Sequence, residues 1–116
     1  MLVHRLVSAA GSVNNTLVSS SVTRVHAIYA TNANVSARYL KLYNKATTPA
    51  AGTDTPYMTL YLPTTNVNGG FCKFEFPSPV VLSTGLGYAL TTAVADNDTG
   101  ALTAADVVAL SIVYTP

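Results

Sequence analysis

Apolar and polar side chains alternate with a period of two along much of this chain, and this pattern limits the possible folds more than any other feature. Successive side chains of an extended strand point to opposite faces, so an alternating segment can form a strand with one face on a core. Six segments alternate in this way or are rich in β-branched residues: 22–29, 38–43, 57–62, 71–76, 88–94 and 107–114. The pattern predicts an all-β protein.

Clusters rich in Asn, Gly, Pro and Thr separate these segments, at residues 31–34, 47–52, 66–70, 77–79 and 96–100. Asn and Gly tolerate positive φ and Pro fixes φ, so each cluster can end a strand. The only helical segment that we expect is one turn at residues 103–106. Short strands at this spacing favour an antiparallel β-sandwich or a jelly-roll-like barrel of about 6–8 strands.

The length of 116 residues and the 49% of hydrophobic residues predict one domain with a core of its own. We assign this domain to residues 22–116. Residues 1–21 combine small polar stretches with short apolar patches, which predicts a peripheral N-terminal arm or an edge strand. Arg5 interrupts the first apolar run, so we expect no secretory signal, and no apolar run is long enough to predict a membrane partner.

The charge balance excludes proteins that bind nucleic acid through its phosphates. Lys and Arg number 6 and Asp and Glu number 5, which gives a net charge of +1. Lys41 lies between tyrosines that could stack on bases, but the total charge is too small for such a partner. Only 9% of the residues are charged, against about 25% in a typical domain. This composition indicates surface that is buried against other chains.

The residues that could carry catalysis are His4, His26 and Cys72, and they lie far apart in the sequence. No nucleophile motif accompanies them, and two His with one Cys do not make a zinc pattern. Cys72 alternates with Phe74 and Phe76, which predicts a small buried side chain. We expect His26 to be a structural or interface residue, and the protein to be non-enzymatic and without a cofactor.

A metal site is the other chemical possibility, with Asp96, Asp98 and Asp106 as candidate calcium ligands. The calcium loop of an EF-hand needs a third oxygen ligand at its fifth position and a terminal Glu. Here the fifth position is Gly100, and the Glu is absent. We therefore expect these residues to form a hydrogen-bonded turn.

Tyrosine is the most informative residue type, since the chain has seven Tyr and no Trp. Interfaces are rich in Tyr and poor in charge, because a tyrosine combines apolar area with a hydroxyl that can stay hydrogen-bonded. Alternation places six side chains on the outward faces of two neighbouring strands, and these predict a protein–protein interface: Tyr39, Lys41, Tyr43, Tyr57, Thr59 and Tyr61. The alternative is that both faces of this sheet are internal to the domain.

Residues 38–45 and 52–56, followed by Phe76, 83–86, 96–99 and the closing strand at 107–114, resemble small β-rich virion proteins of tailed bacteriophages and prophages. The likeness covers residues 22–115 as a succession of short motifs. It implies a virion component made in the host cytoplasm, such as a capsid decoration (cement) protein. Such a protein would form a homo-oligomer, preferably a trimer, on the major capsid protein or another virion protein. The alternatives are a tail, neck or fibre-base component, or a carbohydrate-binding module.

Overall fold

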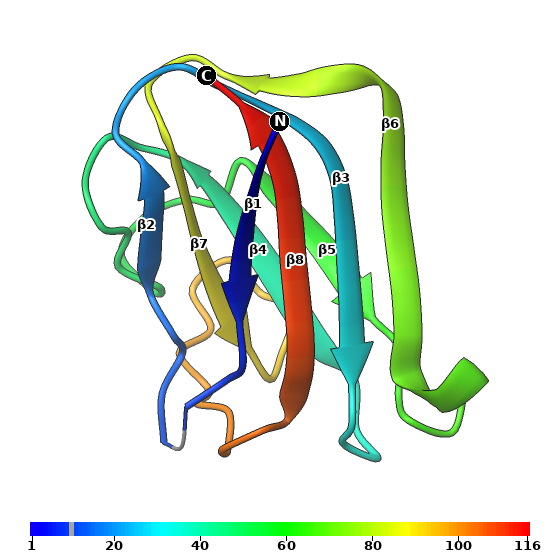
Figure 1. Cartoon of the computed structure of the whole chain (residues 1–116). Helices are drawn as coiled ribbons and strands as arrows, with labels where there is room; N and C mark the ends of the chain where they lie inside the picture. Colours follow the sequence, from blue (N-terminus) through cyan, green and yellow to red (C-terminus); the bar gives the residue numbers. More distant parts are fainter. Residues whose placement is uncertain (10) are drawn as a thin grey trace.

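Two four-stranded antiparallel sheets pack face to face as a β-sandwich (Figure 1). The structure is a computed structural model, and it describes residues 1–9 and 11–116. The first sheet has the order β1-β8-β3-β6, and the second has the order β2-β7-β4-β5. The strands are β1 (Leu2–Leu6), β2 (Thr16–Ser19), β3 (Thr23–Asn32), β4 (Arg38–Asn44), β5 (Met58–Leu62), β6 (Phe71–Leu82), β7 (Leu86–Thr91) and β8 (Val107–Thr115). The predicted all-β sandwich is confirmed.

The core lies between the sheets and consists of the inward-facing residues of each strand. Leu40 and Leu42 of β4 face Ile28 of β3 and Ile112 of β8, and all four are fully buried. Burying one such side chain stabilises the fold by about 2 kcal/mol. The period-two alternation of these residues is thus the direct cause of the two-layer architecture.

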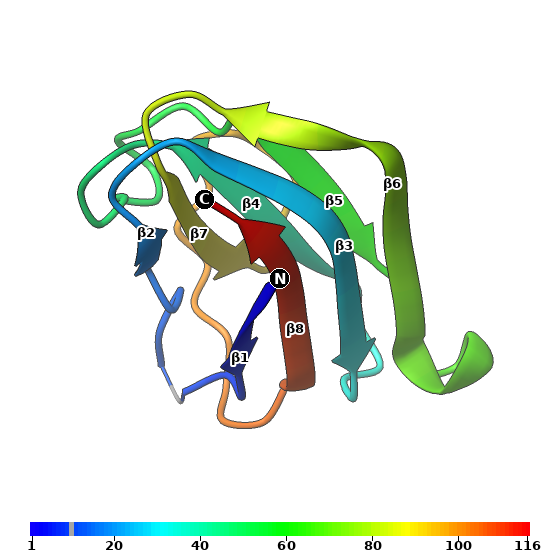
Figure 2. The same ribbon diagram turned by 45° about the horizontal axis from the view of Figure 1, so that its top comes forward.

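Residues 77–79 do not form the predicted turn, because β6 continues through them to Leu82. A proline cannot donate a ladder hydrogen bond, but β6 is an edge strand and therefore tolerates Pro77 and Pro79. The pairing with β3 is irregular at this point: Ala27 lies opposite Glu75, whereas Val25 lies opposite Val80. The strand bends sharply between its two halves (Figure 2).

Residues 1–21 supply an edge strand to each sheet. β1 pairs with β8, and β2 pairs with β7 (Figure 1). Between them the chain is held by backbone bonds, among them Ser8 N to the Val107 carbonyl at 3.0 Å. Residue 10 of this predicted segment lies outside the described residues. The N-terminal segment is thus part of both sheets.

Candidate interaction surfaces

The predicted tyrosine interface lies on the outer face of β4 and β5, and part of it is accessible. Tyr39 lies opposite Tyr61 in the strand register, and the two rings meet edge to face with centroids 5.8 Å apart. Tyr57 and Tyr61 are 54% and 52% exposed, while Tyr39 and Thr59 are half-buried. These four side chains form an outward surface, which we call the tyrosine face.

Lys41 and Tyr43 are not accessible, so their prediction as exposed interface residues is wrong. Both side chains point away from the core but are fully buried by the chain's own loops. Lys41 Nζ donates a hydrogen bond to the Ala95 carbonyl in the loop after β7. A Cβ added at Gly52 would lie 2.4 Å from the Thr99 side chain, so the loop after β4 touches the loop after β7. Alternation tells which side of a sheet a residue faces, but not whether a loop covers that side.

Burial changes the ionisation of both covered side chains. It lowers the pKa of Lys41, although the negative charges of Asp98 and Asp96 act against this shift. It raises the pKa of Tyr43, and the charges of Asp54 and Asp96 add to that effect. The Tyr43 hydroxyl has no hydrogen-bond partner among residues 1–9 and 11–116. Tyr43 therefore contributes to packing as an aromatic ring.

We expect Tyr43→Phe to leave the free energy of unfolding unchanged or to raise it by up to about 1 kcal/mol, because it removes a buried, unpaired hydroxyl. Tyr88→Phe is the matched control. The Tyr88 hydroxyl lies 2.9 Å from Nε2 of His4 and links β7 to β1 of the other sheet. We expect this control to lose about 1 kcal/mol. Urea unfolding measures both, and equal losses in the two variants would show that the Tyr43 hydroxyl is bonded.

Two of the three candidate calcium ligands, Asp98 and Asp106, form hydrogen-bonded turns, and the third, Asp96, is exposed in the loop after β7. Oδ2 of Asp98 accepts bonds from the backbone N–H groups of Ala93 and Gly100, at 3.2 and 3.0 Å. Asp106 is nearly buried and accepts bonds from Arg38 and other donors elsewhere in the fold. In the part of the chain that the structure describes, no group of three His, Cys, Asp or Glu side chains is arranged to hold a metal ion.

Asp106 joins the start of β4 to the turn before β8. Its carboxylate accepts bonds from Arg38 Nε at 3.1 Å, Asn34 Nδ2 at 3.0 Å and the Thr103 hydroxyl at 2.7 Å. Burial alone would raise the pKa of Asp106, but the bonds from Thr103, Asn34 and Arg38 outweigh it and lower the pKa to about 2. The charged carboxylate is therefore part of the folded structure.

This carboxylate predicts an acid-sensitive stability. The folded pKa lies below the ordinary value of 3.8, so the contribution is complete above about pH 4 and is lost as the pH falls toward 2. The shift corresponds to about 2 kcal/mol. We expect Asp106→Asn to remove this part of the pH dependence, measured by chemical unfolding between pH 2 and 6. An unchanged slope in that variant would contradict the assignment.

The residues considered for catalysis are held in structural contacts. His26 Nε2 lies 2.9 Å from the Thr115 hydroxyl, and the His4 ring bonds to Tyr88. Burial lowers the pKa of His4. Cys72 faces the core, as its alternation predicts, but it is only half-buried because it lies on the edge strand β6, and this partial burial raises the pKa of its thiol.

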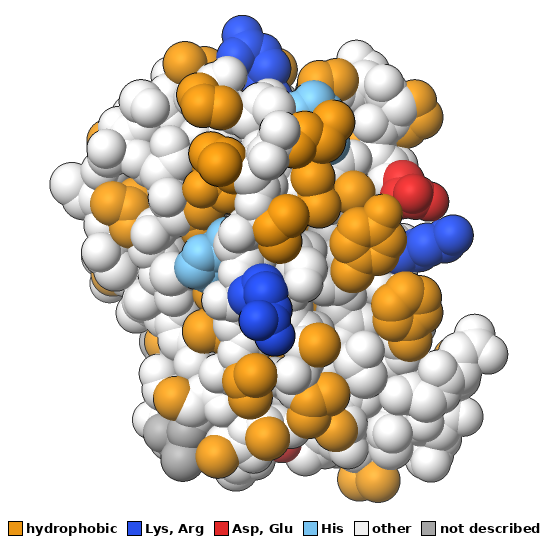
Figure 3. All heavy atoms as spheres, in the orientation of Figure 1, with side chains coloured by type: hydrophobic (Ala, Val, Ile, Leu, Met, Phe, Trp, Pro, Cys, Tyr) orange, Lys and Arg blue, Asp and Glu red, His pale blue; other side chains and the backbone are white. Residues whose placement is uncertain are grey.

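The outer face of the first sheet is a second apolar surface, which the focus on tyrosine overlooked. Exposed side chains on it include Val3, Val7, Phe71 and Val81. Figure 3 shows this face, where hydrophobic side chains are widespread and charged ones are few. The alternation of Val3, Arg5 and Val7 in the sequence could have revealed the β1 part of this surface. We call it the first-sheet face.

No protein-family model, curated protein or solved structure matches the chain. Among the described residues, no helix has the length and apolar character required to cross a membrane. A shallow pocket lies at the end of β1, lined by Arg5, Leu6 and Val7, on the border of the first-sheet face.

Proposed function

We propose that this chain is a non-enzymatic virion structural protein of a tailed phage or prophage. Within that class we favour a capsid decoration protein that self-associates and binds the assembled head, with the major capsid protein as its partner. The observation that carries the proposal is the first-sheet face, where Val3, Val7, Phe71 and Val81 are exposed on a rigid sheet. These side chains lie along both edges of the sheet, and apolar side chains that gather on one exposed face favour an interaction site. The sequence resemblance to virion proteins directs the choice of partner.

The proposed mechanism is mechanical. The first-sheet face would cover apolar surface that two neighbouring capsid subunits present together, so that it binds the shell and not the separate subunits. A ligand that binds only one state stabilises that state. Burying one exposed valine adds about 1–2 kcal/mol, and many copies on one shell add their contributions. The low content of charged residues, 9%, keeps the desolvation cost of such a contact small.

Sedimentation with purified heads tests this proposal. We expect the chain to sediment with assembled heads and not with unassembled capsid protein. Val3→Asp, on the first-sheet face, should weaken head binding at least tenfold because it buries a charge in the contact. Val94→Asp is the matched control, since Val94 is 59% exposed against 57% for Val3 and follows β7 of the second sheet. Equal binding by both variants, or no binding by the parent chain, would overturn the proposal.

Two other functions are distinguished from capsid decoration by their own experiments. A tail, neck or fibre-base component would be labelled in intact particles at the tail and not over the head. A carbohydrate-binding module is favoured by the exposed rings of Tyr57 and Tyr61, on which a sugar could stack. A glycan array on which binding is saturable and lost in Tyr57→Ala would support that module in place of the virion role.

A further inference from the structure

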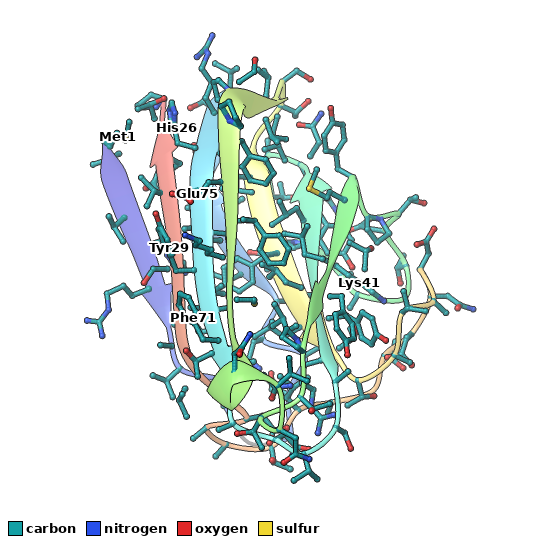
Figure 4. The ribbon with its side chains drawn as sticks, turned by 90° about the vertical axis from the view of Figure 1, so that its right-hand side faces the viewer. Met1, His26, Tyr29, Lys41, Phe71 and Glu75 are labelled. Atoms are coloured by element: carbon teal, nitrogen blue, oxygen red, sulfur yellow. The ribbon has the colours of Figure 1, made fainter. Side chains whose placement is uncertain are left out.

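The free edge of β6 is the feature that the proposed function does not use. β6 is the outermost strand of the first sheet, and among the described residues it pairs only with β3. Figure 4 faces this side of the sandwich, with Phe71 and Glu75 labelled along β6. An unpaired edge presents backbone N–H and C=O groups to which another strand can bond. Pro77 has no backbone N–H to donate to an added strand, so the segment of β6 that is available for pairing ends before it and comprises residues 71–76.

Apolar side chains line the same side of the sandwich and are only half-buried. On β6 they are Cys72, Phe74 and Phe76, and on the edge strand β5 of the second sheet they are Met58 and Leu60. All five pack against the core from its border, whereas inward-facing residues of the inner strands such as Ile28, Leu40 and Ile112 are fully buried. We call this border the β5–β6 seam. A strand added to β6 would extend the sheet and cover part of the seam.

We propose that β6 pairs with β6 of a second copy of this chain, antiparallel about a two-fold axis at Phe74. The charges of the strand select this register. Lys73 and Glu75 both point outward, with their side chains 60% and 58% exposed and Nζ 3.5 Å from Oε1. With the axis at Phe74, Lys73 of each copy lies opposite Glu75 of the other. Opposite charges at facing positions stabilise a strand pair, and like charges destabilise it.

The direction of the side chains and the repulsion between like charges exclude the neighbouring registers of the β6–β6 pair. Residues that face each other across a strand pair point to the same side of the sheet, so an axis between two residues would set Lys73 opposite the inward-facing Phe74. An axis at Lys73 would set two lysines opposite each other, and an axis at Glu75 would set two glutamates opposite each other. Only the axis at Phe74 matches both the charges and the apolar side chains, since it sets Cys72 opposite Phe76.

This contact is two-fold and closed, so we expect a dimer in solution in place of the trimer that the resemblance implies. The inference does not rest on the proposed virion role, because it concerns only the β6 edge. In the monomer, the charge of the exposed Lys73 disfavours pairing of the β6 edge with unrelated apolar strands, because such pairing would bury the charge without a partner. In the dimer the same residue becomes part of a group of four alternating charges.

Sedimentation equilibrium of charge variants tests the contact. K73E places like charges opposite each other, and so does E75K, so each variant alone should dimerise at least tenfold more weakly than the parent chain. Mixing K73E with E75K restores opposite charges at every facing position, and the mixture should dimerise again as a heterodimer. Both positions are exposed, so both variants should fold. Arg5→Glu is the control, since Arg5 is an exposed charge on β1 at the opposite edge of the sheet.

The outcomes separate the two proposals. A monomeric or trimeric parent chain, or a dimer that K73E and E75K leave unchanged, would overturn the β6 contact and leave the head-binding experiment untouched. Failure of the mixture to dimerise while both variants stay folded would overturn the register. Loss of head binding in Val3→Asp with an unchanged dimer would support the decoration role independently.

Discussion

Leu42→Asp will abolish the folded state of the isolated chain. Leu42 lies in the middle of β4 with no exposed surface, inside the cluster that joins the two sheets. The substitution removes about 2 kcal/mol of apolar burial and places a carboxylate where it has no partner, which costs several kcal/mol more. A domain of this size is stable by about 5–15 kcal/mol. Loss of the cooperative thermal transition in circular dichroism is the expected result, and Ile112→Asp should behave in the same way.

Tyr61→Ser is the control for that experiment, because Tyr61 is on the outer face of the neighbouring strand. It loses the edge-to-face contact with Tyr39, which is worth about 1 kcal/mol, and leaves the core intact. We expect a cooperative transition close to that of the parent chain, together with weaker assembly if the tyrosine face contacts a partner. A loss of stability as large as that of Leu42→Asp would mean that the outward placement of Tyr61 is wrong.

Gly70→Ala should cost at least about 3 kcal/mol, the second largest effect that we expect. Gly70 ends the short 3-10 helix η1 (Asn68–Gly70) before β6, with φ at +79°. A Cβ at this position would lie 1.8 Å from the carbonyl oxygen of Asn32. Asn32 cannot move away, because it is buried and its side chain donates bonds to the carbonyls of Ser36 and Pro63. Urea unfolding measures the loss.

Gly69→Ala separates the clash from the backbone conformation. Gly69 also has a positive φ, +67°, but a Cβ there would meet no atom within 4 Å. The left-handed conformation alone costs a residue with a side chain about 1–2 kcal/mol. Gly69→Ala should therefore be the milder variant by a clear margin. Equal losses at the two positions would show that the close approach to Asn32 is not the cause.

The period-two pattern predicted the sandwich and its six main strands because it reports the burial of alternate side chains directly. The pattern did not predict the structure of segments that bury few side chains. β1 and β2 are short edge strands with little core contact. The sequence of residues 1–21 was therefore compatible with either a peripheral arm or an edge strand. Prolines such as Pro77 and Pro79 are typical of turns. An edge strand has no partner strand on its outer side, so a missing backbone N–H is tolerated there, and β6 continues through both prolines.

The candidate tyrosine interface was predicted only in part from the sequence. The exposure of Tyr57 and Tyr61 follows from alternation on the edge strand β5 and the residue before it. Lys41 and Tyr43 have the same pattern on β4, yet loops from both ends of the sandwich cover them. The path of those loops depends on contacts such as Gly52 with Thr99, between residues distant in sequence. No local pattern encodes such a contact.

The pairing of β1 with β8 has a consequence for biosynthesis. Leu2 lies opposite Tyr114, so β1 must wait for a partner strand that is synthesised much later. Contacts between residues so far apart in the sequence delay folding, because a long loop must close before they form. We therefore expect the first sheet to be completed only after synthesis has passed Thr115, on a timescale of milliseconds to seconds. Until then, Leu6 and its neighbours on β1 are without their partner strand, and such unpaired apolar segments make a nascent chain prone to aggregate.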